Sequence, residues 1–193
     1  MPGSSIHAAT ADDLVPLHRL IERAYRGDTA RAGWTHEADL LDGQRTDMAA
    51  LADVMADPHQ CILVAEAEEK IIGCVQIASK EEGLAYLGLL TVDPLLQARG
   101  LGKMLIEAAE REAASRFGAK RMEMTVIRQR SELIAYYVRR GYAPTGEERP
   151  FPLDDPRFGL PRSRDLAFAV LARKLNAVGA SPRPPEEQAV SRP

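Results

Sequence analysis

The chain has little of what metal and disulfide sites are built from. Its 193 residues include only two cysteines and four histidines. Cys61 and Cys74 lie within the apolar runs CILVAEA and IIGCVQIA, where a free thiol usually packs as a small buried hydrophobic group. The histidines are scattered, and none stands at ligand spacing from a cysteine or from another histidine. We therefore expect two core cysteines and no bound metal.

Long apolar runs and a strong excess of charge are also missing. No run approaches the roughly 20 apolar residues of a membrane span, and the N-terminal MPGSSIHAATADD lacks the basic and apolar regions of a secretory signal. The formal net charge of −3 gives no overall attraction to nucleic acid. No aromatic interleaving supports a nucleic-acid patch among Arg121, Arg128, Arg130, Arg139 and Arg140. We expect a cytoplasmic protein with neither membrane nor nucleic acid as a partner.

What the chain does have is an alternation of strand-like and helix-like segments. Apolar periodicity predicts the order β-αα-βββ-α-β-α-ββ. The expected strands cover residues 6–9, 61–66, 71–79, 84–92, 121–127, 142–147 and 165–175, and the expected helices residues 14–25, 46–57, 100–117 and 131–140. This order predicts a mixed α/β fold with a predominantly antiparallel sheet and one β-α-β crossover. We expect a single domain over residues 1–175 and a disordered, proline-rich tail over 176–193.

The stretch QARGLG, residues 97–102, joins a buried strand to a helix. Two glycines at such a junction let the backbone approach a ligand closely, and the free N–H groups of the first helical turn favour an anion. A tight turn selected for packing is the alternative interpretation. Two familiar phosphate loops do not fit, because the dinucleotide fingerprint needs glycine in place of Leu105 and a Walker loop needs Ser or Thr in place of Met104.

A longer pattern surrounds these glycines. The residues that form V-x-P-x-x-Q-x-x-G-x-G are Val92, Pro94, Gln97, Gly100 and Gly102. This pattern resembles the acetyl-CoA-binding motif of the GNAT acetyltransferase superfamily. The stretch AYYVRRGY, residues 135–142, is similar to a second feature of that superfamily, a tyrosine shortly before a Gly-aromatic pair.

The resemblance implies acetyl-CoA as cosubstrate and a set of residues that bind it. The backbone N–H groups of the loop would hold the pyrophosphate, with electrostatic help from the basic side chains beside them. Backbone groups on the preceding strand would pair with pantetheine and polarise the thioester carbonyl. The implied coenzyme-binding residues are Leu90, Val92, Gln97, Arg99, Gly100, Leu101, Gly102 and Lys103.

Tyr137 is the candidate catalytic residue that the resemblance implies. A phenol with a pKa near ~10 keeps its proton at neutral pH and can give it to a departing thiolate. The competing interpretation is a tyrosine that only fills the helix's buried face. Tyr136, about 100° away around the helix, is the better candidate for packing.

No residue stands out as the general base. Many GNAT members use a glutamate on the strand before the loop, but this chain has Tyr86 at the equivalent place and no carboxylate over residues 84–91. Water, or one of the acids Glu37, Asp39, Asp42 and Asp47, is left for this role, and the same acids hint at a cationic acceptor. Trp34 either lines a pocket or anchors this segment.

The function predicted from this resemblance is acetyl transfer from acetyl-CoA to a primary amine of a small molecule or peptide, by direct attack in a ternary complex. The alternative is a non-catalytic acyl-CoA-binding module that has lost its base. The sequence leaves open the acceptor, the acyl-chain preference, the oligomeric state (a homodimer included), and whether the proline-rich loop Arg149–Asp165 covers the acceptor site.

Overall fold

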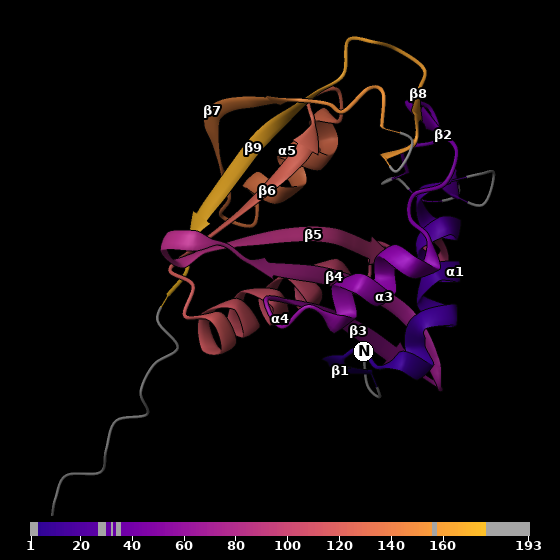
Figure 1. Ribbon diagram of the computed structural model, residues 1–193, viewed down its shortest axis with the longest axis vertical. Helices are drawn as coiled ribbons and strands as arrows, with labels where there is room; N and C mark the ends of the chain where they lie inside the picture. The colour runs from indigo at the N-terminus through magenta and orange to yellow at the C-terminus, as the bar shows by residue number, and fades with distance from the viewer. Residues whose placement is uncertain (1–3, 27–29, 32, 34–35, 156–157, 177–193) are drawn as a thin grey trace, which may run out of the picture.

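Figure 1 shows the computed structural model, which describes residues 4–26, 30–31, 33, 36–155 and 158–176. One mixed sheet holds most of the strands. In spatial order they are β1 (Ser5–Ala8), β3 (Gln60–Ala67), β4 (Lys70–Ser79), β5 (Leu84–Val92), β6 (Arg121–Ile127), β9 (Ala167–Lys174) and β7 (Ala143–Pro150). Every neighbouring pair is antiparallel except β5 and β6, which are parallel. The predicted mixed α/β fold with one crossover is therefore confirmed.

The helices are α1 (Leu14–Tyr25), α3 (Met48–Ala56), α4 (Leu101–Phe117) and α5 (Ser131–Val138). A capping box between Thr10 and Asp13 begins the first helical segment, as the sequence predicted, because the Asp13 carboxylate accepts from the Thr10 backbone N–H at 2.7 Å. The Asp47 carboxylate caps α3. In the part of the chain that the structure describes, no helix is long and apolar enough to cross a membrane.

Helices cover both faces of the sheet. Leu17, Ile21 and Tyr25 of α1 pack with Leu51 of α3 against one face, and α4 packs its stripe of Leu105, Ala109 and Ala113 against the other. Cys61 and Cys74 are buried and unpaired in this core, as predicted. The two clusters hold β4 and β5 between them, so the carboxyl end of β5 is fixed on both sides.

The structure also contains elements that the sequence did not predict. A two-residue strand, β2 (Leu41–Asp42), pairs with β8 (Leu160–Pro161), and the Arg162 guanidinium donates to the Asp42 carboxylate at 2.6 and 3.0 Å. This small sheet is too short for periodicity to reveal. It ties the acidic segment after α1 to the long connection between β7 and β9.

Candidate active site

The site begins where β5 and β6 separate. These strands pair only over Leu84–Tyr86 and Arg121–Glu123, so the rest of β5 has no partner on that side. Beyond Gly88, β5 carries one extra residue relative to β4, and Leu89 takes a left-handed φ of 51° at this bulge. The Asp93 N–H donates to β4, so strand alternation turns the backbone groups of Leu90 and Val92 toward the gap.

Two side chains hold the exposed carbonyls of this strand end. The Tyr25 hydroxyl donates to the Leu90 carbonyl at 2.8 Å, and the Gln97 side-chain amide donates to the Val92 carbonyl at 3.4 Å. Gln97 also lies against Gly33, where a Cβ would come within 2.8 Å of its amide nitrogen. Gln97 therefore positions the loop as well as lining the site.

The loop enters α4 through two left-handed residues, Ala98 (φ 65°) and Gly100 (φ 85°). Met104 is the first residue of the helix whose N–H bonds back, to the Gly100 carbonyl at 3.1 Å. The amides of the preceding turn, Leu101–Lys103, are the orphan donors that every helix N-terminus has. A Cβ built at Gly100 meets no described atom within 4 Å, so open space lies beside the loop.

Gly102 is required by close contact. A Cβ at this position would come within 2.5 Å of the Tyr136 hydroxyl of α5. The Arg140 guanidinium lies 3.2 Å from the centroid of the Tyr136 ring and fixes that ring from the other side. Tyr136, predicted to be a packing residue, therefore forms part of the wall facing the loop.

A cavity of about 390 Å³ lies between the loop, the end of β5 and α5; we call it the loop cavity. The predicted residues that line it are Leu90, Val92, Gln97, Gly100, Leu101, Gly102 and Tyr137. Arg99 and Lys103 are exposed and do not line it, and the Lys103 ammonium pairs with Glu107 at 3.7 Å.

A second cavity, of about 420 Å³, opens between β5 and β6; we call it the sheet cavity. Its walls mix apolar residues such as Leu51, Val54 and Phe168 with polar ones such as Thr46, Gln76 and Thr125. The Tyr86 hydroxyl crosses the gap to the Thr125 hydroxyl at 2.7 Å. The Tyr86 hydroxyl is thus already engaged in a hydrogen bond.

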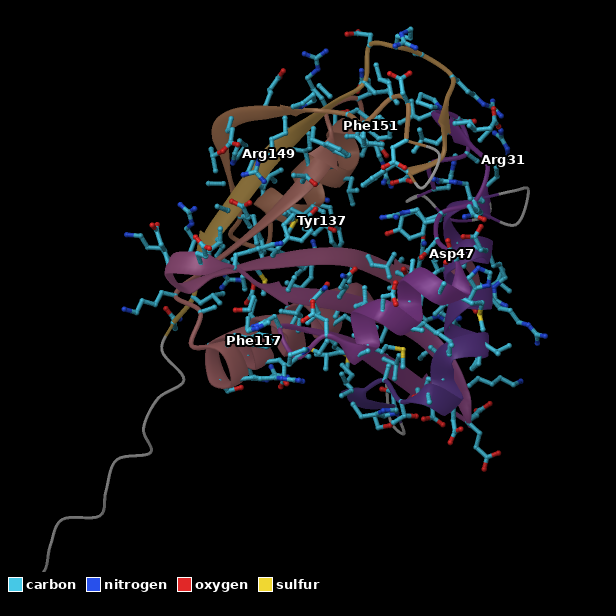
Figure 2. The ribbon with its side chains drawn as sticks, viewed as in Figure 1. Arg31, Asp47, Phe117, Tyr137, Arg149 and Phe151 are labelled. Carbon is cyan, nitrogen blue, oxygen red and sulfur yellow. The ribbon has the colours of Figure 1, made fainter. Side chains whose placement is uncertain are left out.

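Tyr137 lines both cavities, together with Tyr25, Leu90, Arg130 and Leu133. Figure 2 shows Tyr137 in the gap between β5 and β6. Its side chain is 6% exposed, and burial raises its pKa well above the usual value, so the phenol keeps its proton. Within the described part of the chain its hydroxyl makes no hydrogen bond.

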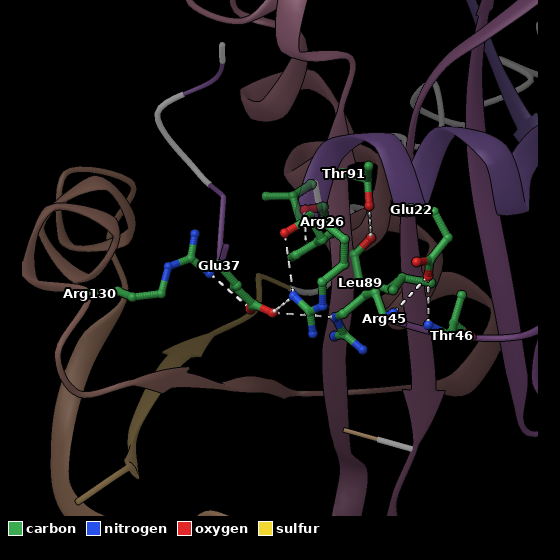
Figure 3. Close-up of polar contacts among 10 residues, drawn as sticks. Glu22, Arg26, Glu37, Arg45, Thr46, Leu89, Thr91 and Arg130 are labelled. Atoms are coloured by element: carbon green, nitrogen blue, oxygen red, sulfur yellow. Dashed lines mark hydrogen bonds and ion pairs between the residues drawn. The ribbon is translucent and has the colours of Figure 1, made fainter. Parts of the chain in front are cut away.

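Glu37 lies at the mouth of the sheet cavity within a cluster of arginines (Figure 3). Its carboxylate accepts from Arg26 at 2.8 Å and from Arg130 at 3.1 Å, and lies 3.9 Å from the Arg45 Nε. Burial alone would raise its pKa, but the charges of Arg45, Arg130 and Arg26 outweigh that effect and lower the pKa below its usual range. Glu37 is therefore a weak base.

The other predicted acids are engaged elsewhere. Asp39 pairs with Arg31 at 2.6 Å, Asp42 binds Arg162, and Asp47 caps α3. Trp34 and residues 177–193 of the predicted tail lie outside the described residues. Phe158, from the connection between β7 and β9, lines the sheet cavity. Among the residues that the structure describes, no three His, Cys, Asp or Glu side chains gather as a metal site would require.

Three residues of the site were missed by sequence reasoning. Tyr25 carried only a core signal, although its hydroxyl holds the Leu90 carbonyl. Arg45 lies in a segment without periodicity, and its guanidinium is 5.0 Å from the centroid of the Tyr25 ring. Tyr136 was predicted only to pack, because its contact is with a glycine of a different helix. No local pattern in the sequence marks any of these contacts.

Comparison with known proteins gives one family and many related folds. A family model described as "Acetyltransferase (GNAT) family" matches residues 16–142. The chain is similar to the ribosomal-protein-S18-alanine N-acetyltransferase from Escherichia coli, with 16% identity and a TM-score of 0.66 over 91% of this chain and 96% of that one. The comparison with curated proteins gave no match.

Two further solved structures share the fold. The putative acetyltransferase YncA from Salmonella typhimurium, solved with its cofactor acetyl-CoA, is 18% identical with a TM-score of 0.66 over 93% of this chain and 98% of that chain. The N-acetylglutamate synthase from Neisseria gonorrhoeae, complexed with coenzyme A and N-acetyl-glutamate, is 17% identical with a TM-score of 0.61 over 91% of this chain and 36% of that chain.

Proposed function

Because this chain belongs to the GNAT acetyltransferase family and is an acetyl-CoA-dependent acyltransferase, we propose that it transfers the acetyl group directly to a primary amine while both substrates are bound. One observation carries the proposal. The loop cavity and the sheet cavity share Leu90, Arg130 and Tyr137, so ligands in the two cavities would meet at those residues. A small molecule or a peptide end fits this arrangement as the acceptor.

The loop cavity suits the coenzyme. The space beside Gly100 and the orphan amides of Leu101, Gly102 and Lys103 form an anion-binding helix N-terminus. The gap between β5 and β6 leaves backbone groups of Leu90 and Val92 for pairing with an extended ligand. The Arg99 and Lys103 side chains, exposed beside the loop, add favourable charge for a phosphate.

The chemistry of the family sets what the residues must do. Bound acetyl-CoA supplies a thioester; its carbonyl carbon forms a bond to the amine nitrogen while the bond to sulfur breaks. The Leu90 N–H polarises the carbonyl oxygen, because this backbone group faces the gap. Tyr137 holds a proton next to this point and gives it to the departing sulfur, and the proton that the nitrogen loses after attack returns through water to the phenolate.

The amine must lose its proton before it attacks. The sheet cavity has no described histidine in its wall, and its one carboxylate, Glu37, has a lowered pKa. The acceptor therefore reaches the site as the neutral amine formed in solvent, or passes its proton out through water. A missing base slows the reaction at neutral pH but does not prevent it. The argument against the non-catalytic alternative is therefore that the chain belongs to an acetyltransferase family.

The test is substitution of Tyr137 by phenylalanine, with release of the coenzyme A thiol as the assay over a panel of primary amines. We expect Tyr137→Phe to lower kcat by about 100-fold, the low end for loss of a general acid, and to leave the Kd for acetyl-CoA unchanged in calorimetry. Tyr142→Phe is the control, since this tyrosine is also buried but lines neither cavity, and its hydroxyl donates to Glu110. Full activity of Tyr137→Phe would contradict the assignment of the acid.

A further inference from the structure

We propose that the acceptor amine carries a carboxylate or another anionic group, and that Arg45 together with Arg130 binds it in the sheet cavity. This inference rests on the proposed function, because it names the class of acceptor for the same site. The sequence had suggested the opposite, a cationic acceptor, from four acids in one segment. In the structure, three of those four acids do not line the cavity.

The charges that face the sheet cavity are two guanidinium groups and one carboxylate. These belong to Arg45, Arg130 and Glu37; the other described side chains in the wall are uncharged. Behind them, Arg26 adds a third guanidinium, which is 8% exposed. The nearby Glu22 carboxylate lies outside the cavity and accepts from the backbone N–H groups of Arg45 and Thr46 at 2.7 and 2.9 Å. Positive charge therefore exceeds negative charge at this wall.

Glu37 attracts a cationic acceptor only weakly, because each of its oxygens already accepts from an arginine. One oxygen lies 2.8 Å from Arg26 Nη1 and the other 3.1 Å from Arg130 Nη1. The ammonium group of a cationic acceptor would have to approach Glu37 past guanidinium groups, which carry the same sign of charge. Polyamines and lysine-like amines are thus poor matches for this cavity.

Arg45 has hydrogen-bonding capacity to spare. Among the described residues its closest carboxylate contact, 3.9 Å to Glu37, is longer than a hydrogen bond, and its side chain is 28% exposed. A guanidinium has five N–H donors in a fork that matches a carboxylate. Arg45 lines the sheet cavity and not the loop cavity, so its charge faces the acceptor rather than the coenzyme.

The uncharged residues of the sheet cavity indicate the size and polarity of the rest of the acceptor. Leu51, Val54 and Phe168 give part of the cavity an apolar lining, and about 420 Å³ is enough for a molecule the size of an amino acid. An amine with a carboxylate and an apolar side chain would place its charge on Arg45 and Arg130. Arg130 also lines the loop cavity, which brings the anionic end near the transfer point.

The experiment compares acceptors with and without the anionic group, with kcat/KM expressed for the neutral amine because the carboxylate also changes the pKa of that amine. Leucine, phenylalanine and methionine are each tested beside the matching amide and the matching amine without its carboxylate, with spermidine as the polycation. We expect kcat/KM for at least one amino acid to exceed that of its amide at least tenfold. Equal or faster reaction of the amides and decarboxylated amines in every set would overturn the inference.

Substitution of Arg45 assigns the effect to the residue. Arg45→Gln should reduce the preference for the acid over its amide at least tenfold, mainly through KM, while Arg45→Lys should retain part of it. Arg31→Gln, which removes an exposed charge of the same segment outside the cavity, should keep the wild-type preference. The same loss of preference in Arg31→Gln would show that net charge alone is responsible and would overturn the role of Arg45.

A binding measurement separates this inference from the proposed function. 4-Methylpentanoate, the leucine skeleton without its amine, should raise the melting temperature of the wild type and inhibit competitively against the amine, and Arg45→Gln should abolish both effects. If uncharged or cationic amines are acetylated and carboxylates neither react nor bind, only this inference fails. If no amine is acetylated and acetyl-CoA does not bind, the proposed function fails as well.

Discussion

Glu37 is a single buried carboxylate on which three arginines converge. Removing one partner from such a cluster leaves the others as uncompensated buried charge. We expect Glu37→Gln to lower the free energy of unfolding at pH 7 by about 3 kcal/mol, measured by urea denaturation. Asp39→Asn, which breaks an exposed pair with Arg31, should change it by less than about 0.5 kcal/mol.

The difference in the free energy of unfolding between the wild type and Glu37→Gln should depend on pH in a definite direction. The folded-state pKa of Glu37 is lowered, so its stabilising contribution is complete above the unfolded pKa of about 4.3 and is lost as the pH falls through the folded value. The gap between the wild type and Glu37→Gln should therefore narrow below about pH 4.3. A gap that stays constant down to the acid transition would show that Glu37 is not held ionised by the arginines.

Gly102 tests the contact between α4 and α5. Gly102→Ala alone should weaken acetyl-CoA binding and lower stability, because the new Cβ must displace a Tyr136 hydroxyl 2.5 Å away. In a Tyr136→Phe background the nearest ring atom is 3.7 Å away, an ordinary contact, and alanine then gains up to about 1 kcal/mol in the helix. We expect a non-additive double-mutant cycle in urea unfolding, and additive effects would rule out the contact.

At the scale of one element, α4 has a left-handed glycine at each end. Gly100 and Gly118 both have a left-handed φ, and a Cβ at either meets no described atom within 4 Å. They differ in place, since Gly100 precedes the orphan amides and Gly118 follows the last turn. The same substitution at Gly100 and at Gly118 therefore distinguishes an effect on ligand binding from an effect of backbone strain.

We expect Gly100→Glu to weaken acetyl-CoA binding at least tenfold in calorimetry, because the new carboxylate occupies the position proposed for the pyrophosphate. Gly118→Glu should bind acetyl-CoA as the wild type does, although it carries the same kind of strain. Equal loss in both variants would show that strain and not the anion site explains the result. Unchanged binding in Gly100→Glu would place the phosphates elsewhere.

At the scale of the whole molecule, the two cavities together determine how activity responds to pH. Burial raises the pKa of Tyr137, and burial likewise raises that of Tyr25, so neither phenol loses its proton near neutrality. Glu37, with its lowered pKa, stays ionised, and no described histidine lines either cavity. Tyr137, Tyr25 and Glu37 are thus not expected to titrate between about pH 6 and 9.

We expect kcat/KM to rise tenfold per pH unit up to the pKa of the acceptor's own amine and then to level off, with no descending limb before about pH 10. Two acceptors whose amines differ in pKa should give midpoints that differ by the same amount. A midpoint near neutrality that does not move with the acceptor would reveal an enzymic base.

Sequence reasoning succeeded where the signal is local. Strands 84–92 and 121–127 were predicted with the ends that the structure has, since apolar spacing and the flanking turns define them. The helix after Gly100 and the capping box at Thr10 follow from spacing within a few residues. The glycine loop was likewise visible, because a left-handed turn before a helix restricts which residues can occupy it.

The sequence by itself therefore determined the order of the elements, the glycine loop and the family of the chain. Only the tertiary structure decided which charges face the sheet cavity. Glu37 and Arg130 lie 93 positions apart, and nothing in either segment indicates that the acid belongs to a cluster of arginines. The charge of a cavity depends on which side chains the fold brings together, and a count of acids along one segment does not contain that information.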